Sequence, residues 1–295
     1  MKGINHTLFI AGCVIAALLT AACNGKQPVK SLGLEVTQVR VSTDTTPAMP
    51  TQPEEQPTDE ELRQQQPVSQ TVDEVFDDFI VDFDIKPSFQ RQRVVFPLIV
   101  SNESGNNDTI QASEWQHRYI FMRQDFCTVL WNSKSEMEQM TGRLVEDEAT
   151  VELFYLHSRS MTSLHFKRDD SGRWLLNSII NSSFMNHELA SFLDFYRQFA
   201  TDSTFQQEHL ASQLHYATTD DDTDEGFIEG TIGSEQWTEF APEMPQDAIT
   251  NIRYGQTYNH PHRIVMQMQG FDDGFQALFI FRKESGKWRL TGFEN

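Results

Sequence analysis

Three ionisable side chains have the types needed for general acid–base chemistry. His157 and His165 lie in YLHSRSMTSLHF, and Asp78 lies in FDDF near the start of the sequence that can fold. An Asp–His pair inside an apolar pocket can act as a general base, because desolvation shifts its pKa values. His157 and Arg159 alternate along an expected strand, so we expect them to share a face. A solvated outer face is the alternative interpretation.

The acidic stretch TTDDDTDEG contains a possible calcium loop. Asp220, Asp222 and Asp224 have the alternate spacing that lets carboxylate oxygens wrap around a hard cation. However, Glu225 stands where the loop needs Gly, and Thr231 stands where it needs a bidentate Glu. A solvated acidic loop therefore remains the alternative to a metal site.

A second possible metal site is the segment NHPH. His260 and His262 alternate on what would be an extended segment, which can present both imidazoles to one metal ion. No third ligand is identifiable, so a surface loop is the alternative. The sequence has no nucleophile elbow, phosphate loop, dinucleotide fingerprint or zinc-helix motif, and we expect no cofactor.

The aromatic residues allow two interpretations. Tryptophans that recur at similar places in the chain can pack a core, and they can also line a ligand pocket. The recurrence itself favours core packing. The five tryptophans are Trp115, Trp131, Trp174, Trp237 and Trp288.

The amino terminus resembles a bacterial lipoprotein signal. The run TLFIAGCVIAALLTAAC is apolar but short for a membrane span, and two alanines lead directly into Cys23. We expect residues 1–22 to be removed and Cys23 to carry lipid. A rival interpretation ends the signal at Cys13, but it leaves a short apolar core. Cys127 would then be the one remaining thiol, and its apolar neighbours favour a core position.

Charge and composition restrict the partners. The formal net charge is −20 over 295 residues and no basic cluster is present, which argues against nucleic acid. Residues 23–72 are rich in Pro, Thr, Gln and Glu, so we expect the lipidated Cys23 to be followed by a disordered linker. Residue 24 is Asn and no acidic run follows it, which favours the periplasmic face of the outer membrane over the cell surface. The partner would be a small molecule, a glycan or a protein.

The folded part contains an internal duplication. FDDFIVDFDIKPSFQ from Phe76 and FLDFYRQFATDSTFQ from Phe192 place Phe, Asp and Gln at the same intervals, 116 positions apart. The ends also match, HFKRDDSGRWLL against FIFRKESGKWRL. Polar pairs shared by both copies, such as Gln90 and Gln206, are expected to serve the common fold. Positions that differ, such as Arg93 against His209, are freer to serve a function of one copy.

Each copy is expected to begin with helices and end with strands. Phe76, Phe79 and Phe83 have helical spacing, and Pro87 should stop the helix before a second short one. Ser203 and Gln206 suggest a capping box in the second copy. The segments near residues 149–180 and 263–292 alternate as strands, with SG turns joining the last two. The fold class is α+β, with two tandem repeats of helices followed by a curved antiparallel sheet.

The two aromatic blocks and the SG[RK]W ends resemble a family of uncharacterised lipoproteins from gut-dwelling anaerobic bacteria. The resemblance covers residues 73–295 and implies a nuclear-transport-factor-2-like (cystatin-like) fold, in which helices and a curved sheet enclose a cone. We expect repeats at 73–184 and 185–295. The expected function is a lipid-anchored, non-catalytic ligand- or partner-binding module. The alternative is an envelope enzyme of isomerase, hydratase or hydrolase type that uses an Asp–His pair in the cone.

Overall fold

The computed structural model describes residues 59–295 except 123, 141–146, 220–226, 259–261 and 272–273. All of these residues belong to one compact unit, Glu55–Asn295. The expected signal peptide, Cys13, Cys23 and most of the expected linker lie outside the described residues. Within them, no helix is long and apolar enough to cross a membrane.

The order of elements is similar in the two halves of this unit. Each half begins with helices and continues into strands. The first half contains α1 (Asp59–Gln65), α2 (Phe76–Ile85), α3 (Pro87–Gln92), β1 (Val94–Asn102), β2 (Asn107–Ile110), β3 (Phe126–Trp131), α4 (Lys134–Met140), β4 (Glu148–Tyr155), β5 (Ser160–Arg168) and β6 (Trp174–Ser183). The second contains η1 (Phe184–Asn186), α5 (Ala190–Thr201), α6 (Ser203–Glu208), β7 (Leu210–Thr219), β8 (Phe227–Gly233), η2 (Ser234–Gln236), α7 (Trp237–Phe240), β9 (Ala248–Arg253), β10 (Arg263–Gly270), β11 (Gln276–Glu284) and β12 (Lys287–Glu294).

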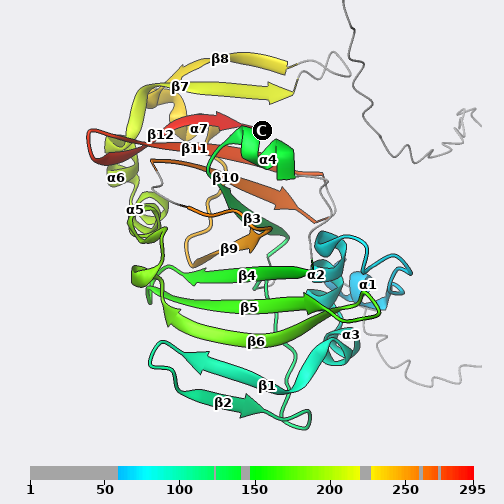
Figure 1. Ribbon diagram of the computed structural model, residues 1–295. Helices are drawn as coiled ribbons and strands as arrows, with labels where there is room; N and C mark the ends of the chain where they lie inside the picture. The colour runs from blue at the N-terminus through cyan, green and yellow to red at the C-terminus, as the bar shows by residue number, and fades with distance from the viewer. Residues whose placement is uncertain (1–58, 123, 141–146, 220–226, 259–261, 272–273) are drawn as a thin grey trace, which may run out of the picture. The chain divides into compact units, whose positions relative to one another are not determined.

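The strands form two six-stranded sheets that exchange one strand each. Sheet A has the order β2-β1-β6-β5-β4-β9, and sheet B has the matching order β8-β7-β12-β11-β10-β3. Strand β3 of the first half therefore pairs with β10 in sheet B, and β9 of the second half pairs with β4 in sheet A. Figure 1 shows these two strands between the rest of the sheets. Neither sheet is built from one sequence half alone.

Both sheets are mixed, which differs from the antiparallel sheets expected from the sequence. Most neighbouring strands are antiparallel, but β1 pairs with β6 in parallel and β12 pairs with β7 in parallel. These pairs join the first and last long strands of each half. The intervening chain is long enough to bring them side by side in the same direction, which a tight hairpin cannot do.

A reciprocal pair of threonines joins the exchanged strands. Thr128 N donates to Thr250 Oγ1 at 2.8 Å, and Thr250 N donates to Thr128 Oγ1 at 2.8 Å. Each hydroxyl also donates to the carbonyl of the other residue, at 2.5 and 3.0 Å. Each threonine thus makes the same two donations to the other. Such reciprocal bonding is expected where β3 and β9 are related by a local two-fold axis.

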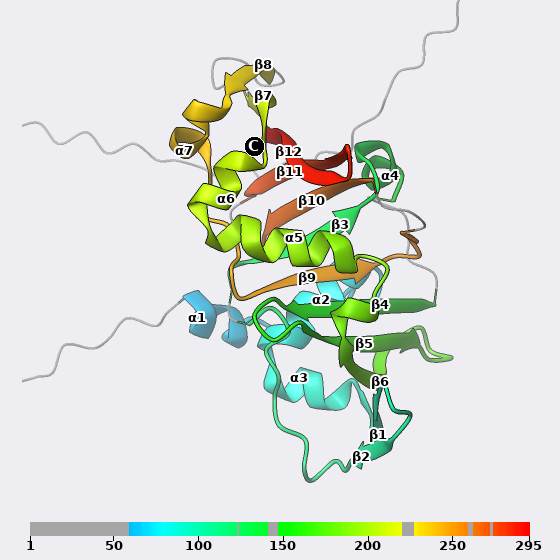
Figure 2. The same ribbon diagram turned by 90° about the vertical axis from the view of Figure 1, so that its left-hand side faces the viewer.

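The phenylalanine stripe of each half buries against one sheet. Phe76, Phe79 and Phe83 on α2 are at most 1% exposed and belong to the core below sheet A. Phe192 and Phe199 on α5 are fully buried in the core of sheet B. Figure 2 shows α5 lying across the strands of sheet B. The helical spacing of the aromatic residues thus places both helices as expected from the sequence.

The two short second helices begin differently. Helix α6 is capped by Asp202, whose Oδ1 accepts from Thr204 N and Phe205 N at 2.9 and 3.0 Å. The expected capping box at Ser203 is therefore wrong, because the preceding Asp supplies the stronger acceptor. Helix α3 has Lys86 at the same position, with no side-chain cap and Pro87 as its first residue.

Candidate functional site

The space between α2 and sheet A is filled by aromatic rings. The centroid of Phe76 lies 4.9 Å from that of Trp174, and Phe79 and Phe83 lie 5.7 and 5.2 Å from Phe166, all at steep interplanar angles. Edge-to-face contacts of this kind are the favoured packing of aromatic side chains. An open cone would have its cavity between α2 and sheet A, and these rings fill that space.

The second half is packed in the same way. Phe192 lies 5.3 Å from Phe281 and 5.4 Å from Trp288, and Phe199 lies 5.5 Å from Phe281. These contacts join α5 to β11 and β12. All five tryptophans of the chain are at most 8% exposed, so their rings pack within the cores.

The acid–base candidates from the sequence do not come together. Strand β4 ends at Tyr155, so His157 and Arg159 lie in an exposed turn instead of alternating along a strand. Arg159 has a positive φ of 54° and pairs with Asp194 at 2.8 Å, and His157 contacts Asp247 at 3.0 Å. The turn breaks the alternation that the sequence pattern suggested.

His165 and Asp78 lie on opposite sides of sheet A. Leu164 and Phe166 face the core under α2, so His165 between them faces away from it. Its Nδ1 lies 3.1 Å from Thr150 Oγ1, and its buried Nε2 has no partner among the described atoms. Burial lowers the pKa of His165 below its usual 6.5. Asp78 is exposed on α2, so the two residues cannot form one site.

The metal-site candidates are only partly described. Asp220, Asp222, Asp224 and His260 lie outside the described residues, and His262 is exposed. Within the part of the chain that the structure describes, no group of three or more His, Cys, Asp or Glu residues is arranged to hold a metal ion.

A buried polar cluster around Glu152 was missed from the sequence. Glu152 lies in β4 and is 3% exposed, and its carboxylate contacts His187 Nε2 at 3.2 Å, Asn251 Nδ2 at 2.8 Å and Arg253 at 3.4 Å. Leu189 N donates to His187 Nδ1, which leaves Nε2 to donate to Glu152. The sequence signal for this cluster is the Glu in the otherwise apolar stretch ATVELFY. A carboxylate buried in such a strand needs hydrogen-bonding or cationic partners.

This cluster holds the exchanged strand β9 to sheet A. Burial raises the pKa of Glu152, but the hydrogen bonds and charges of His187, Asn251 and Arg253 outweigh burial, so the pKa lies below 4.5. The corresponding register position in sheet B is Gln267, which accepts from Trp131 Nε1 at 2.9 Å. The carboxylate is enclosed and fully hydrogen-bonded, which suits a structural tie better than proton transfer to a substrate.

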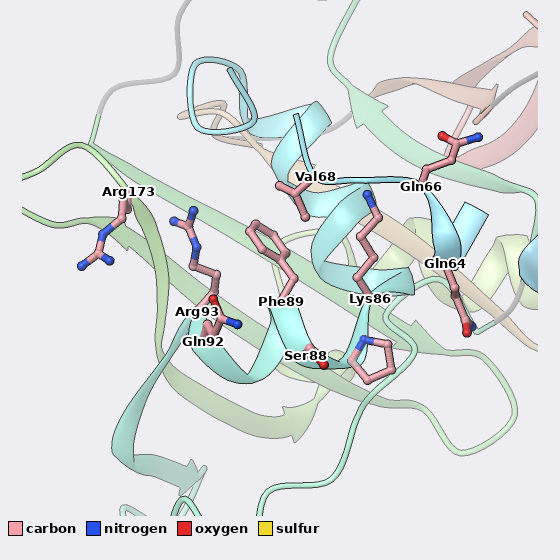
Figure 3. A pocket seen from close by; sticks show the side chains of 10 residues that line it. Gln64, Gln66, Val68, Lys86, Ser88, Phe89, Gln92, Arg93 and Arg173 are labelled. Carbon is pink, nitrogen blue, oxygen red and sulfur yellow. The ribbon is translucent and has the colours of Figure 1, made fainter. Parts of the chain in front are cut away.

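A surface cleft of about 520 Å³ lies beside α3. Figure 3 shows α3 with the side chain of Lys86 pointing toward the segment that carries Gln66 and Val68. Arg93 lies beside the ring of Phe89, with its guanidinium carbon 4.8 Å from the ring centroid. The cleft is lined by Gln64, Gln66, Val68, Lys86, Pro87, Ser88, Phe89, Gln92, Arg93 and Arg173.

Three cations line this cleft, and each has an acidic partner outside its lining. Arg93 forms a two-bond pair with Asp73 at 2.8 and 2.9 Å. Lys86 pairs with Asp82 at 2.5 Å, and Arg173 pairs with an Asp in the β5–β6 turn at 2.7 Å. These pairs fix the cationic groups in place, and the described residues of the lining include no carboxylate.

A second cleft of about 580 Å³ lies between α4 and sheet B. Its lining is more apolar and includes Met137, Ala217 and Leu278. Its charged groups, Lys134 and Glu294, are paired with each other at 2.6 Å. The two charged side chains among the described residues of this lining therefore neutralise each other.

The comparisons place the chain in a family. The family model of a domain of unknown function, DUF4348, matches residues 55–295. The chain belongs to the DUF4348 family. No curated protein matches it. The chain is similar to a solved structure, an NTF2-like protein from Bacteroides fragilis NCTC 9343 determined at 2.15 Å resolution. The two sequences are 32% identical, and the structures match with a TM-score of 0.71. The match covers 77% of this chain and 98% of the Bacteroides fragilis chain.

This DUF4348 protein therefore has an NTF2-like fold, as the resemblance of its aromatic blocks implied. The matched span contains both sheets and the cleft beside α3. The family description assigns no activity, so the function has to be argued from the side chains of this chain.

Proposed function

We propose that the protein is a lipid-anchored module of the cell envelope that binds a ligand or partner and catalyses no reaction. The observation that carries the binding role is the lining of the cleft beside α3. The described residues of this lining present Gln, Ser, Lys and Arg side chains, and none of them carries a carboxylate, an imidazole or a thiol. Such a lining supplies hydrogen-bond donors to hold a ligand, and the amino group of Lys86 bonds to Asp82 and not to Ser88, so these two residues do not form a nucleophile–base pair.

The packing of the two cores supports binding over the enzyme alternative. That alternative needs an Asp–His pair in an open cone between helices and sheet. Phe76 and Phe192 and the rings around them fill these spaces, and Asp78 and His165 face opposite sides of sheet A. An enzyme would have to place its chemistry elsewhere on the molecule.

The anchor is proposed from the sequence. Cys23 follows an apolar run and two alanines, which is the arrangement at which bacterial lipoproteins are cleaved and acylated. The Pro- and Gln-rich residues after it would hold the folded unit away from the membrane. We propose the periplasmic face of the outer membrane as its location.

The anchor is tested by expressing the full chain in a bacterium that processes lipoproteins. We expect the wild-type chain and Cys13→Ala to partition into detergent, with a lipid mass on residue 23. Cys23→Ala should partition into the aqueous phase. Lipid on Cys13, or detergent partition of Cys23→Ala, would contradict the proposal. Cys13→Ala is the matched control, because both substitutions remove one thiol from the same segment.

A further inference from the structure

We propose that the cleft between α4 and sheet B binds a small neutral molecule that has an apolar ring. This inference goes beyond the proposed function, which rests on the cleft beside α3. The cleft lies on the face of sheet B that is turned away from α5, because Leu278 lines it while the next residue, Phe279, packs in the core with α5. Figure 2 shows α4 on the opposite side of β11 and β12 from α6 and α7. A ligand can therefore reach this cleft without opening the aromatic core of α5.

The lining of this cleft is largely apolar. Met137 of α4, Ala217 of β7 and Leu278 of β11 belong to it, and each is at most 8% exposed. Phe275 adds a half-buried ring to the lining. Carbon surface of this kind gains when a ligand replaces the water against it. The volume of about 580 Å³ lies within the range of roughly 300–1,000 Å³ that small-molecule sites occupy.

The charges of the cleft favour a neutral ligand. Lys134 of α4 and Glu294 of β12 are paired at 2.6 Å, and His215 Nε2 lies 3.6 Å from the other oxygen of Glu294. An ionised ligand would give up its hydration and find both charges of the described lining already engaged with each other. A neutral ligand loses less hydration when it enters. The pair also joins α4 to β12, so it holds two walls of the cleft together.

The first half of the chain shows that this apolar lining is not required by the shared fold. Ala217 and Leu278 flank Glu294 in sheet B. In sheet A, Ser101 and Ser163 flank the corresponding residue of β6. The two sheets have matching strand orders, so these positions are equivalent. Apolar side chains at both positions belong to the second half alone, which favours a function of that half over a requirement of the fold.

An aromatic ring covers the equivalent end of sheet A. Phe184 of η1 is fully buried, and its ring centroid lies 6.5 Å from that of Phe154, in the core that also contains Met161. Met161 pairs with Phe154 across β5 and β4, as Gln276 of the cleft lining pairs with its neighbour in β10. The two pairs lie the same number of residues before the bulges of β5 and β11. A ring-shaped ligand in the cleft would therefore take a place like that of Phe184.

The test is a calorimetric titration of the full chain with probes that share one ring system: indole, which is neutral, indoleacetate, which is an anion, and tryptamine, which is a cation. We expect indole to bind and both charged probes to bind about tenfold more weakly, because each must give up its hydration. Octanol is apolar and neutral but has no ring, so it should also bind more weakly than indole. No binding of indole, or equal binding of a charged probe or of octanol, would overturn the inference.

Thr219→Trp places the site in this cleft. Thr219 is exposed and lines the cleft, so the variant should fold normally and weaken indole binding about tenfold or more by filling the space. Gln213→Trp is the matched control, because Gln213 is exposed on the same strand but lies outside the lining; it should bind as the wild type does. Equal binding by the two variants, with circular dichroism showing both folded, would contradict the proposed site. If indole fails to bind while Cys23 carries lipid, this inference is wrong and the anchored module stands.

Discussion

The substitution Glu152→Gln probes the tie between sheet A and the exchanged strand β9. Glu152 accepts from three donors, His187, Asn251 and Arg253, at 2.8–3.4 Å. A glutamine keeps the shape but has one acceptor oxygen, and its amide N–H₂ then faces donors. Hydrogen bonds to a buried charge are worth about 1.5–3 kcal/mol each. The side chain of Arg253 is 25% exposed and would still form its ion pair with Glu188 at 2.9 Å, which limits the loss of stability in the variant.

We therefore expect Glu152→Gln to lower the free energy of unfolding by about 2–3 kcal/mol at neutral pH, measured by urea denaturation. The pKa of Glu152 lies below its usual 4.5 in the folded state. A depressed carboxylate pKa stabilises the fold at pH above 4.5, and this contribution is lost as the pH falls through the folded-state pKa. The difference between the wild type and the variant should therefore narrow below pH 4.5.

Glu148→Gln on the same strand is the control, because Glu148 is exposed and pairs only with Lys167 in the described structure. It should leave the free energy of unfolding unchanged. The reasoning is refuted if Glu152→Gln is as stable as this control, or if its deficit is the same at pH 7 and pH 4.

Three further substitutions or reactions test the fold. Thr128→Val removes the hydroxyl bonds to Thr250, so it should lower the free energy of unfolding by about 1–3 kcal/mol; an unchanged urea midpoint would contradict the reciprocal pair. Asp202→Ala should cost about 1 kcal/mol through the lost cap of α6, and Asp202→Asn much less; equal losses would point to charge instead of capping. Burial raises the pKa of Cys127 to about 12, so a disulfide reagent at pH 8 should modify the thiol only after urea unfolding, and rapid native reaction would refute its burial.

Local elements were predictable from the sequence because their signals are local. The spacing of Phe76, Phe79 and Phe83 sets one face of a helix, and Pro87 fixes where α2 gives way to α3. Gly172 and Gly286 adopt positive φ angles of 82° and 83° in the turns that the SG pairs predicted. In each case the residues that form the sequence pattern are also the residues that determine the local backbone or its packing.

The exchange of strands was not predictable, because strand pairing is decided by tertiary contacts. FCTVLW and AITNIR are both apolar, and nothing in their alternation states which sheet each one joins. The turn at His157 was misread as strand for a related reason, since LFYLH continues an apolar run past the end of β4. The cleft beside α3 depends on residues from three distant segments, so no single motif could reveal it.

The most direct test of the account is a crystal structure of the full chain without its signal peptide. The account predicts that aromatic rings packed around Phe76 fill the space between α2 and sheet A, and that rings packed around Phe192 fill the space between α5 and sheet B. An open cavity in either space that brings an aspartate and a histidine together would contradict the account and favour the enzyme alternative.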